Sequence, residues 1–286
     1  MTLPGWIYIG IFVHVIIALV FISSLLYYHY KSNTVAVQIA TKIDKYLKEF
    51  GYDAAPFLPE WYNKLSTIVK LDYPPNTVCV VVLSNADMFD KTLPCYISEH
   101  DPELKKGTDC VDLCTKHYMT KAVEELFPGE DVDIIYDWEL QTNSRLPKIN
   151  MSTAGHAAGQ AFYNRPEEIS TPTWEQTKKM FGCSISPKYS GWFGYRAVLV
   201  FKNHQDDTIQ YLPPHDAVET QEQKTKLMEC FNGDWKDPAW RDIVFTDKRY
   251  SVEQLDYFNT LPADRIPKVK ALMDTYNEGD ESKKEL

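Results

Sequence analysis

Three arginines, Arg196, Arg241 and Arg265, are the side chains of this sequence best suited to bind an anion. A planar guanidinium holds a carboxylate through two parallel hydrogen bonds, a geometry that lysine cannot copy. Taken singly, each arginine is better explained by a surface or structural ion pair. The three arginines therefore indicate a carboxylate-binding site only if other residues show that they belong to the same site.

The motifs of several large enzyme classes are absent from the sequence. It contains no Gly-x-Gly-x-x-Gly, Gly-x-x-x-x-Gly-Lys-Ser/Thr, Gly-x-Ser-x-Gly or His-Glu-x-x-His pattern, which removes the simplest dinucleotide, nucleotide, hydrolase and zinc-protease interpretations. The cysteines form no Cys-x-x-Cys pair, and Cys110 and Cys114 lack a partner pair at zinc-finger spacing, so no metal site is predicted. No side chain stands out as a general base, and we assign no catalytic residue.

Three apolar runs predict the buried strands of a sheet. They cover residues 78–83, 133–138 and 195–201, and are rich in β-branched and aromatic side chains. Helical spacing of apolar residues predicts helices over residues 39–50, 112–127 and 152–163. Helices interspersed with well-separated strands are typical of an α+β or α/β sandwich, and we predict the α+β class.

Composition excludes one class of partner. The formal net charge is -10 and the sequence pI is about 5.2. Nucleic-acid affinity rests on Lys and Arg side chains that replace counterions on the phosphates. We therefore expect no nucleic-acid partner.

The first 32 residues predict a membrane anchor. Residues 6–30 contain no Asp, Glu, Lys or Arg, and the apolar run is long enough to cross a bilayer core of about 30 Å as a helix. A cleaved signal peptide is the alternative, but no basic segment precedes the run. Four lysines, at positions 31, 42, 45 and 48, follow it, so the positive-inside rule predicts a cytoplasmic domain tethered to the membrane.

The rest of the chain divides into two parts. Residues 33–275 form one predicted domain, and residues 276–286 form an acidic tail that is too polar to pack and is predicted to be disordered.

A series of short sequence blocks, in order along residues 40–270, resembles the CblC (MMACHC-type) family. The blocks include Pro56-Phe57, Trp61-Tyr62-Asn63, Met88-Phe89-Asp90, Ile134-Ile135-Tyr136-Asp137-Trp138-Glu139, Pro147-Lys148-Ile149, His156-Ala157-Ala158-Gly159, Ser186-Pro187-Lys188-Tyr189-Ser190-Gly191-Trp192-Phe193, Trp240-Arg241-Asp242, Arg249-Tyr250-Ser251 and Pro262-Ala263-Asp264-Arg265. Each block alone is weak, but their shared order makes coincidence improbable.

This resemblance implies a flavin-nitroreductase-like fold and a cobalamin-processing enzyme. Such an enzyme binds cobalamin with its dimethylbenzimidazole base off the cobalt. It removes the upper ligand by reductive decyanation or by alkyl transfer to glutathione, with FMN or FAD and NADPH as the source of electrons. A CblD-type trafficking protein and methionine synthase are the implied partners, and the implied state is a monomer or a ligand-induced homodimer.

The family's site residues carry over onto matching positions of this chain. The implied cobalamin contacts are Asp137, Ile149, Asn150, Met151, Ser152, Tyr163, Asn164, Arg165, Ser184 and Tyr195. The implied glutathione-binding residues are Arg196, Arg241 and Arg265.

Some positions leave alternatives open. His156 suits either the pocket or a hydrogen-bonded position within a helix. Trp192 and Phe193 suit either a cavity wall or an aromatic core. The chain departs from the family at Phe162-Tyr163-Asn164, where relatives have a run of tyrosines, and at Ser184, where they have cysteine. A non-catalytic cobalamin carrier and an FMN-dependent nitroreductase-like enzyme are the alternative functions.

Overall fold

The computed structural model describes residues 34–175, 177–234 and 236–284. Its centre is a four-stranded antiparallel sheet in the order β1 (Tyr52–Phe57), β2 (Thr77–Ser84), β6 (Gly194–Gln205) and β3 (Val132–Tyr136). Every residue of β2 is buried, as expected for a central strand with both faces covered. The continuous apolar run from Val78 to Leu83 has no polar side chain to turn toward water, and this explains the central position of β2.

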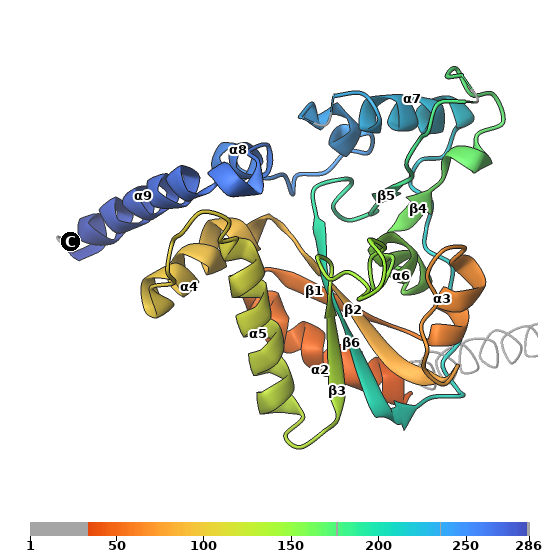
Figure 1. Ribbon diagram of the computed structural model, residues 1–286, viewed down its shortest axis with the longest axis horizontal. Coiled ribbons are helices and arrows are strands. Elements are labelled where there is room, and N and C mark those ends of the chain that lie inside the picture. The colour runs from red at the N-terminus through yellow and green to blue at the C-terminus, as the bar shows by residue number, and fades with distance from the viewer. Residues whose placement is uncertain (1–33, 176, 235, 285–286) are drawn as a thin grey trace, which may run out of the picture.

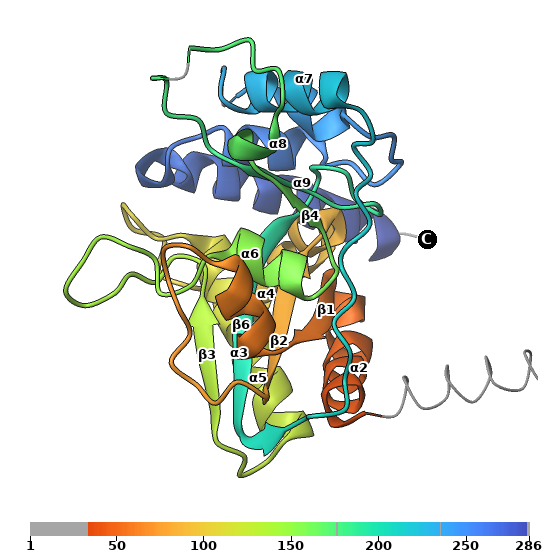
Figure 2. The ribbon, with the colours of Figure 1, turned by 90° about the vertical axis from the view of Figure 1, so that its right-hand side faces the viewer.

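Helices cover the two faces of the sheet (Figures 1 and 2). α2 (Val35–Leu47), α4 (Leu93–His100) and α5 (Cys110–Leu126) pack on one face, in a core that includes Val78, Val80 and Val82. α3 (Pro59–Leu65) and α6 (Met151–Ala157) pack on the other face, against Cys79 and Val81. Successive side chains of a strand point to opposite faces, so one run of residues supplies both cores.

Two further units stand beyond one end of the sheet (Figure 1). A two-stranded ribbon of β4 (Phe162–Asn164) and β5 (Cys183–Ile185) shares a small apolar core with α7 (Gln221–Phe231). The C-terminal arm consists of α8 (Val252–Phe258) and α9 (Ile266–Lys284). Tyr257 of α8 and Val269 of α9 join the core that contains α2, α4 and α5, so the arm is packed onto the domain.

The α+β class and the three predicted strands are confirmed. The predicted helix over residues 152–163 is shorter, because α6 ends at Ala157 and Gly159 adopts a φ of 75° that turns the chain toward β4. Strand β1 was not predicted, because its sequence Tyr-Asp-Ala-Ala-Pro-Phe lacks an apolar run. Pro56 is tolerated there because β1 lies at the edge of the sheet.

The prediction of a fold that begins with a transmembrane helix is corrected. No helix within residues 34–284, as far as the structure describes them, is both long and apolar enough to cross a membrane. The longest of those helices, α9, has 19 residues but carries Lys268, Lys270 and Asp274. The predicted span, residues 6–30, lies outside the described residues. The predicted location, a cytoplasmic domain tethered to a membrane, loses its support with the helix.

The predicted tail overlaps a helix in the structure. α9 continues to Lys284, across most of residues 276–286. The division of the chain into an N-terminal segment, one domain and a tail stays a prediction.

Candidate functional site

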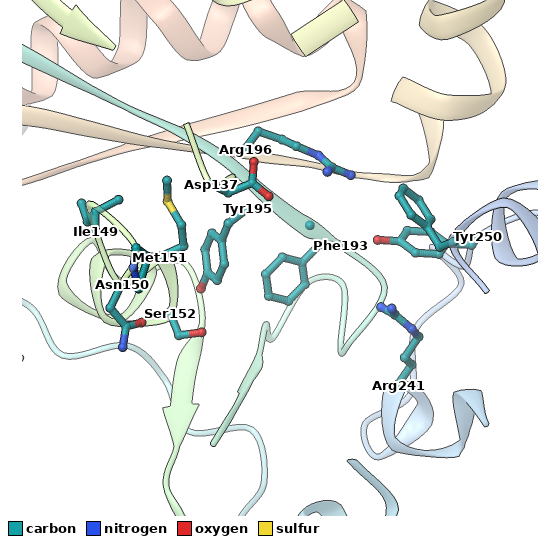
Figure 3. Close-up of a pocket in the computed structure, with 13 residues that line it drawn as sticks. Asp137, Ile149, Asn150, Met151, Ser152, Phe193, Tyr195, Arg196, Arg241 and Tyr250 are labelled. Atoms are coloured by element: carbon teal, nitrogen blue, oxygen red, sulfur yellow. The ribbon is translucent and has the colours of Figure 1, made fainter. Parts of the chain in front are cut away.

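A cavity of about 640 Å³ lies where β6, the end of β3, the start of α6 and the C-terminal arm meet (Figure 3). Ligand cavities in proteins commonly range from about 300 to 1,000 Å³. Six of the predicted cobalamin contacts and two of the predicted arginines line it: Asp137, Ile149, Asn150, Met151, Ser152, Tyr195, Arg196 and Arg241. Residues from four separate segments of the sequence are thus brought to one site.

The start of α6 forms one wall, and its position is fixed by hydrogen bonds. The Asn150 side chain caps α6 by accepting a bond from the Thr153 amide at 3.1 Å, and the Asn150 amide donates to the Tyr62 hydroxyl at 2.9 Å. The N-cap satisfies a helix amide that would otherwise lack a partner. This wall is therefore built on a rigid element.

Gly155 allows α6 to lie directly on the ring of Tyr195. A Cβ added at this glycine would fall 2.0 Å from the Tyr195 hydroxyl oxygen and 2.3 Å from two ring carbons. Tyr195 itself is held on strand β6. Only glycine permits this contact, which orients the tyrosine along the cavity wall.

Three predicted cobalamin contacts carry buried polar atoms that have no partner among the described residues. These atoms are the Tyr195 hydroxyl, the Ser184 hydroxyl and the Asn164 amide oxygen. Buried polar groups are nearly always hydrogen-bonded in folded proteins. The Ser184 hydroxyl also lowers the pKa of Tyr195, so these two hydroxyls lie close to each other, and none of the three atoms is open to the cavity.

Arg196 presents an open guanidinium fork. Its side chain rises from β6, and the residue is 7% exposed. Nε donates to the Ser84 hydroxyl at 2.8 Å, but the terminal nitrogens make no hydrogen bond to the described part of the chain. Asp137 raises the Arg196 pKa, although burial opposes this rise. Arg196 is a buried, permanent cation with two nitrogens available to a carboxylate.

Arg241 approaches the cavity from the opposite side, beside Tyr250 (Figure 3). Its Nη1 donates to the Gly191 carbonyl. The guanidinium carbon lies 4.3 Å from the ring centroid of Trp240 and 5.0 Å from that of Tyr250. These rings hold the guanidinium in place while part of its fork stays free.

Arg265 does not line this cavity. Its Nη1 pairs with the Asp109 carboxylate, and its Nε donates to the Thr260 carbonyl at 3.0 Å. The ring of Phe258, which does line the cavity, lies 5.7 Å from the Arg265 guanidinium carbon. The structure thus divides the predicted set of three arginines into two that face the cavity and one that lies behind it.

Carboxylates surround the arginines. Withdrawal from bulk water raises the pKa of the Asp137 carboxyl, and the Arg196 guanidinium partly opposes that rise. Burial raises the pKa of Asp112, on α5, to about 7, with repulsion from Asp109 and Asp137 adding to it. Two carboxyl groups at this end of the molecule therefore hold a proton more readily than ordinary aspartates do.

The other predicted cobalamin contacts belong to the β4–β5 ribbon. Tyr163 and Arg165 line a neighbouring hollow of about 590 Å³ that shares Asn150 with the main cavity. Ser184 pairs with Tyr163 across the ribbon, and Asn164 is buried beside it. None of these four lines the main cavity, and only Tyr163 and Arg165 line the neighbouring hollow.

His156 and Trp192 have structural roles and do not line the cavity. His156 Nδ1 accepts a bond from the Tyr163 amide at 3.0 Å, and burial lowers its pKa, which favours the neutral ring that this bond requires. Trp192 is 4% exposed, and its Nε1 donates to Asp242 at 2.7 Å. The structure therefore supports a hydrogen-bonded histidine within a helix for His156 and a buried aromatic position for Trp192.

Several lining residues received no site role from the sequence. They are Pro147, Gly194, Tyr250 and Phe258. Pro147 and Tyr250 fall inside the blocks that carry the family resemblance, so these blocks pointed to site residues that were not assigned. Phe193, which the sequence offered as a cavity wall, does line the cavity. Phe258 faces the cavity only because α8 packs back onto the domain.

Comparisons with known proteins show which family the chain resembles. The model of the methylmalonic aciduria and homocystinuria type C family matches residues 51–269. A Gallus gallus protein named cyanocobalamin reductase / alkylcobalamin dealkylase is 39% identical over 80% of this chain and 94% of its own length. The Homo sapiens protein of the same name is 35% identical over 80% of each chain.

A solved structure is also similar. The crystal structure of a Caenorhabditis elegans B12-trafficking protein, CblC, superposes with a TM-score of 0.74 at 26% identity and covers 82% of this chain and 95% of its own. Sequence and structure agree over most of the length of each relative. This chain therefore belongs to the methylmalonic aciduria and homocystinuria type C family.

Proposed function

We propose that this chain is a cobalamin-processing enzyme, a cyanocobalamin reductase and alkylcobalamin dealkylase. Relatives that carry this name match most of the chain. The observation that carries the proposal is the cavity beside β6, in which six predicted cobalamin contacts lie together with Arg196 and Arg241. The chemistry of its walls supports the same substrate.

The walls of the cavity suit a corrin. Met151, Phe193 and Tyr195 offer apolar surface to the macrocycle, and Asn150 and Ser152 offer polar groups to its amides. The adjoining hollow shared through Asn150 gives space beyond the ring. Among the described residues that line the cavity there is no histidine to bind the cobalt. We propose that cobalamin binds base-off, which leaves the cobalt with fewer ligands and easier to reduce.

Glutathione is the proposed co-substrate for dealkylation. The open fork of Arg196 and the partly free fork of Arg241 provide two cations for its two carboxylates. Binding the tripeptide by its ends would bring the thiol close to the alkyl group on cobalt. The bimolecular reaction then becomes effectively unimolecular within the complex. Arg265 supports this site indirectly, because it stacks on Phe258 from behind.

Decyanation requires electrons from a second molecule. We propose reduced FMN or FAD, regenerated by NADPH, as that donor. Delivery of the product to a CblD-type protein or to methionine synthase, and dimer formation on ligand binding, stay predictions.

Anaerobic spectroscopy tests the proposal. Methylcobalamin mixed with the protein and glutathione is expected to give the spectrum of reduced cobalamin, and cyanocobalamin mixed with the protein and reduced FMN is expected to release cyanide. Arg249 pairs with Asp242 outside the cavity, so Arg249→Gln serves as the control and should retain both reactions. Binding without either reaction would identify a carrier and overturn the enzymatic proposal.

A further inference from the structure

Asp137 is a carboxylate that lines the cavity and forms no salt bridge with the described residues. It follows β3, and its amide donates to the Arg196 carbonyl at 3.1 Å, which fixes it beside β6. Its side chain lines the cavity, next to Arg196 (Figure 3). It forms no ion pair and no hydrogen bond to another side chain of the described residues. A carboxylate that is fixed at its backbone and lines the cavity is available to a ligand.

Charged groups from three directions act on Asp137. Arg196 on β6 is the nearest cation and favours its ionised form. Asp109, the N-cap of α5, and Asp112, within α5, repel it. Arg265 is held by Asp109 and therefore contributes little positive charge. The cavity walls and these carboxylates raise the Asp137 pKa, which makes it a better proton acceptor than an exposed aspartate.

The other titratable side chains of the cavity cannot accept a proton near neutral pH. Burial raises the pKa of Tyr195 and that of Tyr250, so both hydroxyls stay protonated. Arg196 and Arg241 are permanent cations. Among the described lining residues, this leaves Asp137 alone as a possible base.

Dealkylation by glutathione needs such a base. A cysteine thiol has an ordinary pKa of about 8.5, so only about 3% is thiolate at pH 7, and the thiolate is the nucleophile. Decyanation removes cyanide with electrons from a donor and takes no proton from a thiol. The two reactions of one cavity therefore differ in their need for a proton acceptor.

Resting on the proposed function, we propose that Asp137 is a catalytic residue of dealkylation and accepts the thiol proton of glutathione as its sulfur attacks the alkyl carbon. The sulfur–carbon bond forms and the cobalt–carbon bond breaks. The electron pair of that bond stays on cobalt, which goes from Co(III) to Co(I). The proton moves from sulfur to the Asp137 carboxylate, and a thioether leaves.

The test compares both reactions in Asp137→Asn, a change that keeps the size of the side chain. At pH 7 dealkylation is expected to fall about 100-fold, the ordinary contribution of a general base. Decyanation is expected to fall far less, so the ratio of the two rates should change at least about 30-fold. Asp131→Asn is the control, because Asp131 pairs with Lys202 just before β3 and is 61% exposed.

A pH profile separates a catalytic role from a structural one. Between pH 7 and 9 glutathione ionises without help, so the dealkylation deficit of Asp137→Asn should shrink by about tenfold or more. Asp137→Glu, which keeps a carboxylate, should recover part of the rate at pH 7. A carboxylate needed only for folding or cobalamin binding would produce neither effect.

Three results would overturn this role for Asp137: equal losses in both reactions, full dealkylation by Asp137→Asn, or a deficit that does not change with pH. Decyanation by the unmodified protein reports separately on the proposed function. If the unmodified protein performs neither reaction, the proposed function fails, and the role of Asp137 fails with it.

Discussion

Asp109 binds Arg265 and thereby fastens the C-terminal arm to the first turn of α5. One oxygen of its carboxylate takes the Arg265 bond, and the other accepts the Tyr257 hydroxyl at 2.8 Å and the Val111 amide at 3.0 Å. The two partners in the arm are 156 and 148 residues away in the sequence. The arm carries Phe258, which lines the cavity, so this one carboxylate links the stability of the arm to the shape of the site.

We predict that Asp109→Asn destabilises the protein by about 2–3 kcal/mol, because it leaves a largely buried guanidinium without a counter-charge. The side chains of the pair are 13% and 16% exposed. Asparagine can still cap α5, so the loss reports on the pair itself. Urea unfolding measures it.

The control for Asp109 is Glu60→Gln, which breaks an exposed pair with Lys64 whose side chains are 46% and 70% exposed. Exposed pairs contribute less than about 1 kcal/mol. Equal effects of Glu60→Gln and Asp109→Asn would show that the Asp109 pair does not fasten the arm.

Arg196→Lys is predicted to raise the KM for glutathione in dealkylation by about 10- to 100-fold, because lysine keeps the charge but loses the fork. Decyanation should change much less, since it uses no tripeptide. Steady-state rates against glutathione concentration check this. An unchanged KM would remove Arg196 from the glutathione site.

Gly155→Ala is predicted to cost about 1–3 kcal/mol of stability, because an extra methyl group has no room in a packed contact. The added Cβ would lie 2.0 Å from the Tyr195 hydroxyl oxygen, so Tyr195 must move into the cavity. We expect weaker cobalamin binding with it, measured by absorbance titration. A variant as stable as the unmodified protein, with the same affinity, would contradict the contact.

We predict that Asp112 makes the stability of the protein depend on pH. Burial and neighbouring carboxylates raise its pKa from 3.8 to about 7 in the folded protein. Between these two values the folded state binds the proton more tightly than the unfolded state, so this group lowers the free energy of unfolding as pH rises through that window. Asp112→Asn should therefore be more stable than the unmodified protein at pH 8 and nearly equal to it at pH 4.

Urea unfolding at both pH values measures this difference. Asp131→Asn, at an exposed position, should show no comparable gain at pH 8. A variant of Asp112 that is less stable at pH 8 would contradict the raised pKa.

The centre of the fold follows from local sequence patterns. The apolar runs at Val78–Leu83 and Tyr195–Phe201 predict strands, because only a buried strand accommodates so many consecutive β-branched and aromatic side chains. The edge strand β1 gives no such signal, because the four residues between Tyr52 and Phe57 are only partly buried. Strand order also escapes prediction, since β2 and β6 pair across more than 100 residues of chain.

The candidate site also has a part that the sequence predicts and a part that it does not. The segments that supply Asp137, Ile149–Ser152 and Tyr195–Arg196 carried enough family resemblance to identify the wall. The position of Arg265 was not predictable, because it depends on its distant partner Asp109. Phe258 entered the cavity for the same reason, as long-range packing of the arm brings it there.

The most direct test of the central claim is an absorbance titration of cyanocobalamin with the purified protein. If the cavity beside β6 receives cobalamin without its lower nitrogen ligand, the spectrum shifts to the base-off form and saturates at one cobalamin per chain. Gly155→Ala should weaken this shift. A cobalamin that stays base-on, or does not bind, would contradict the account.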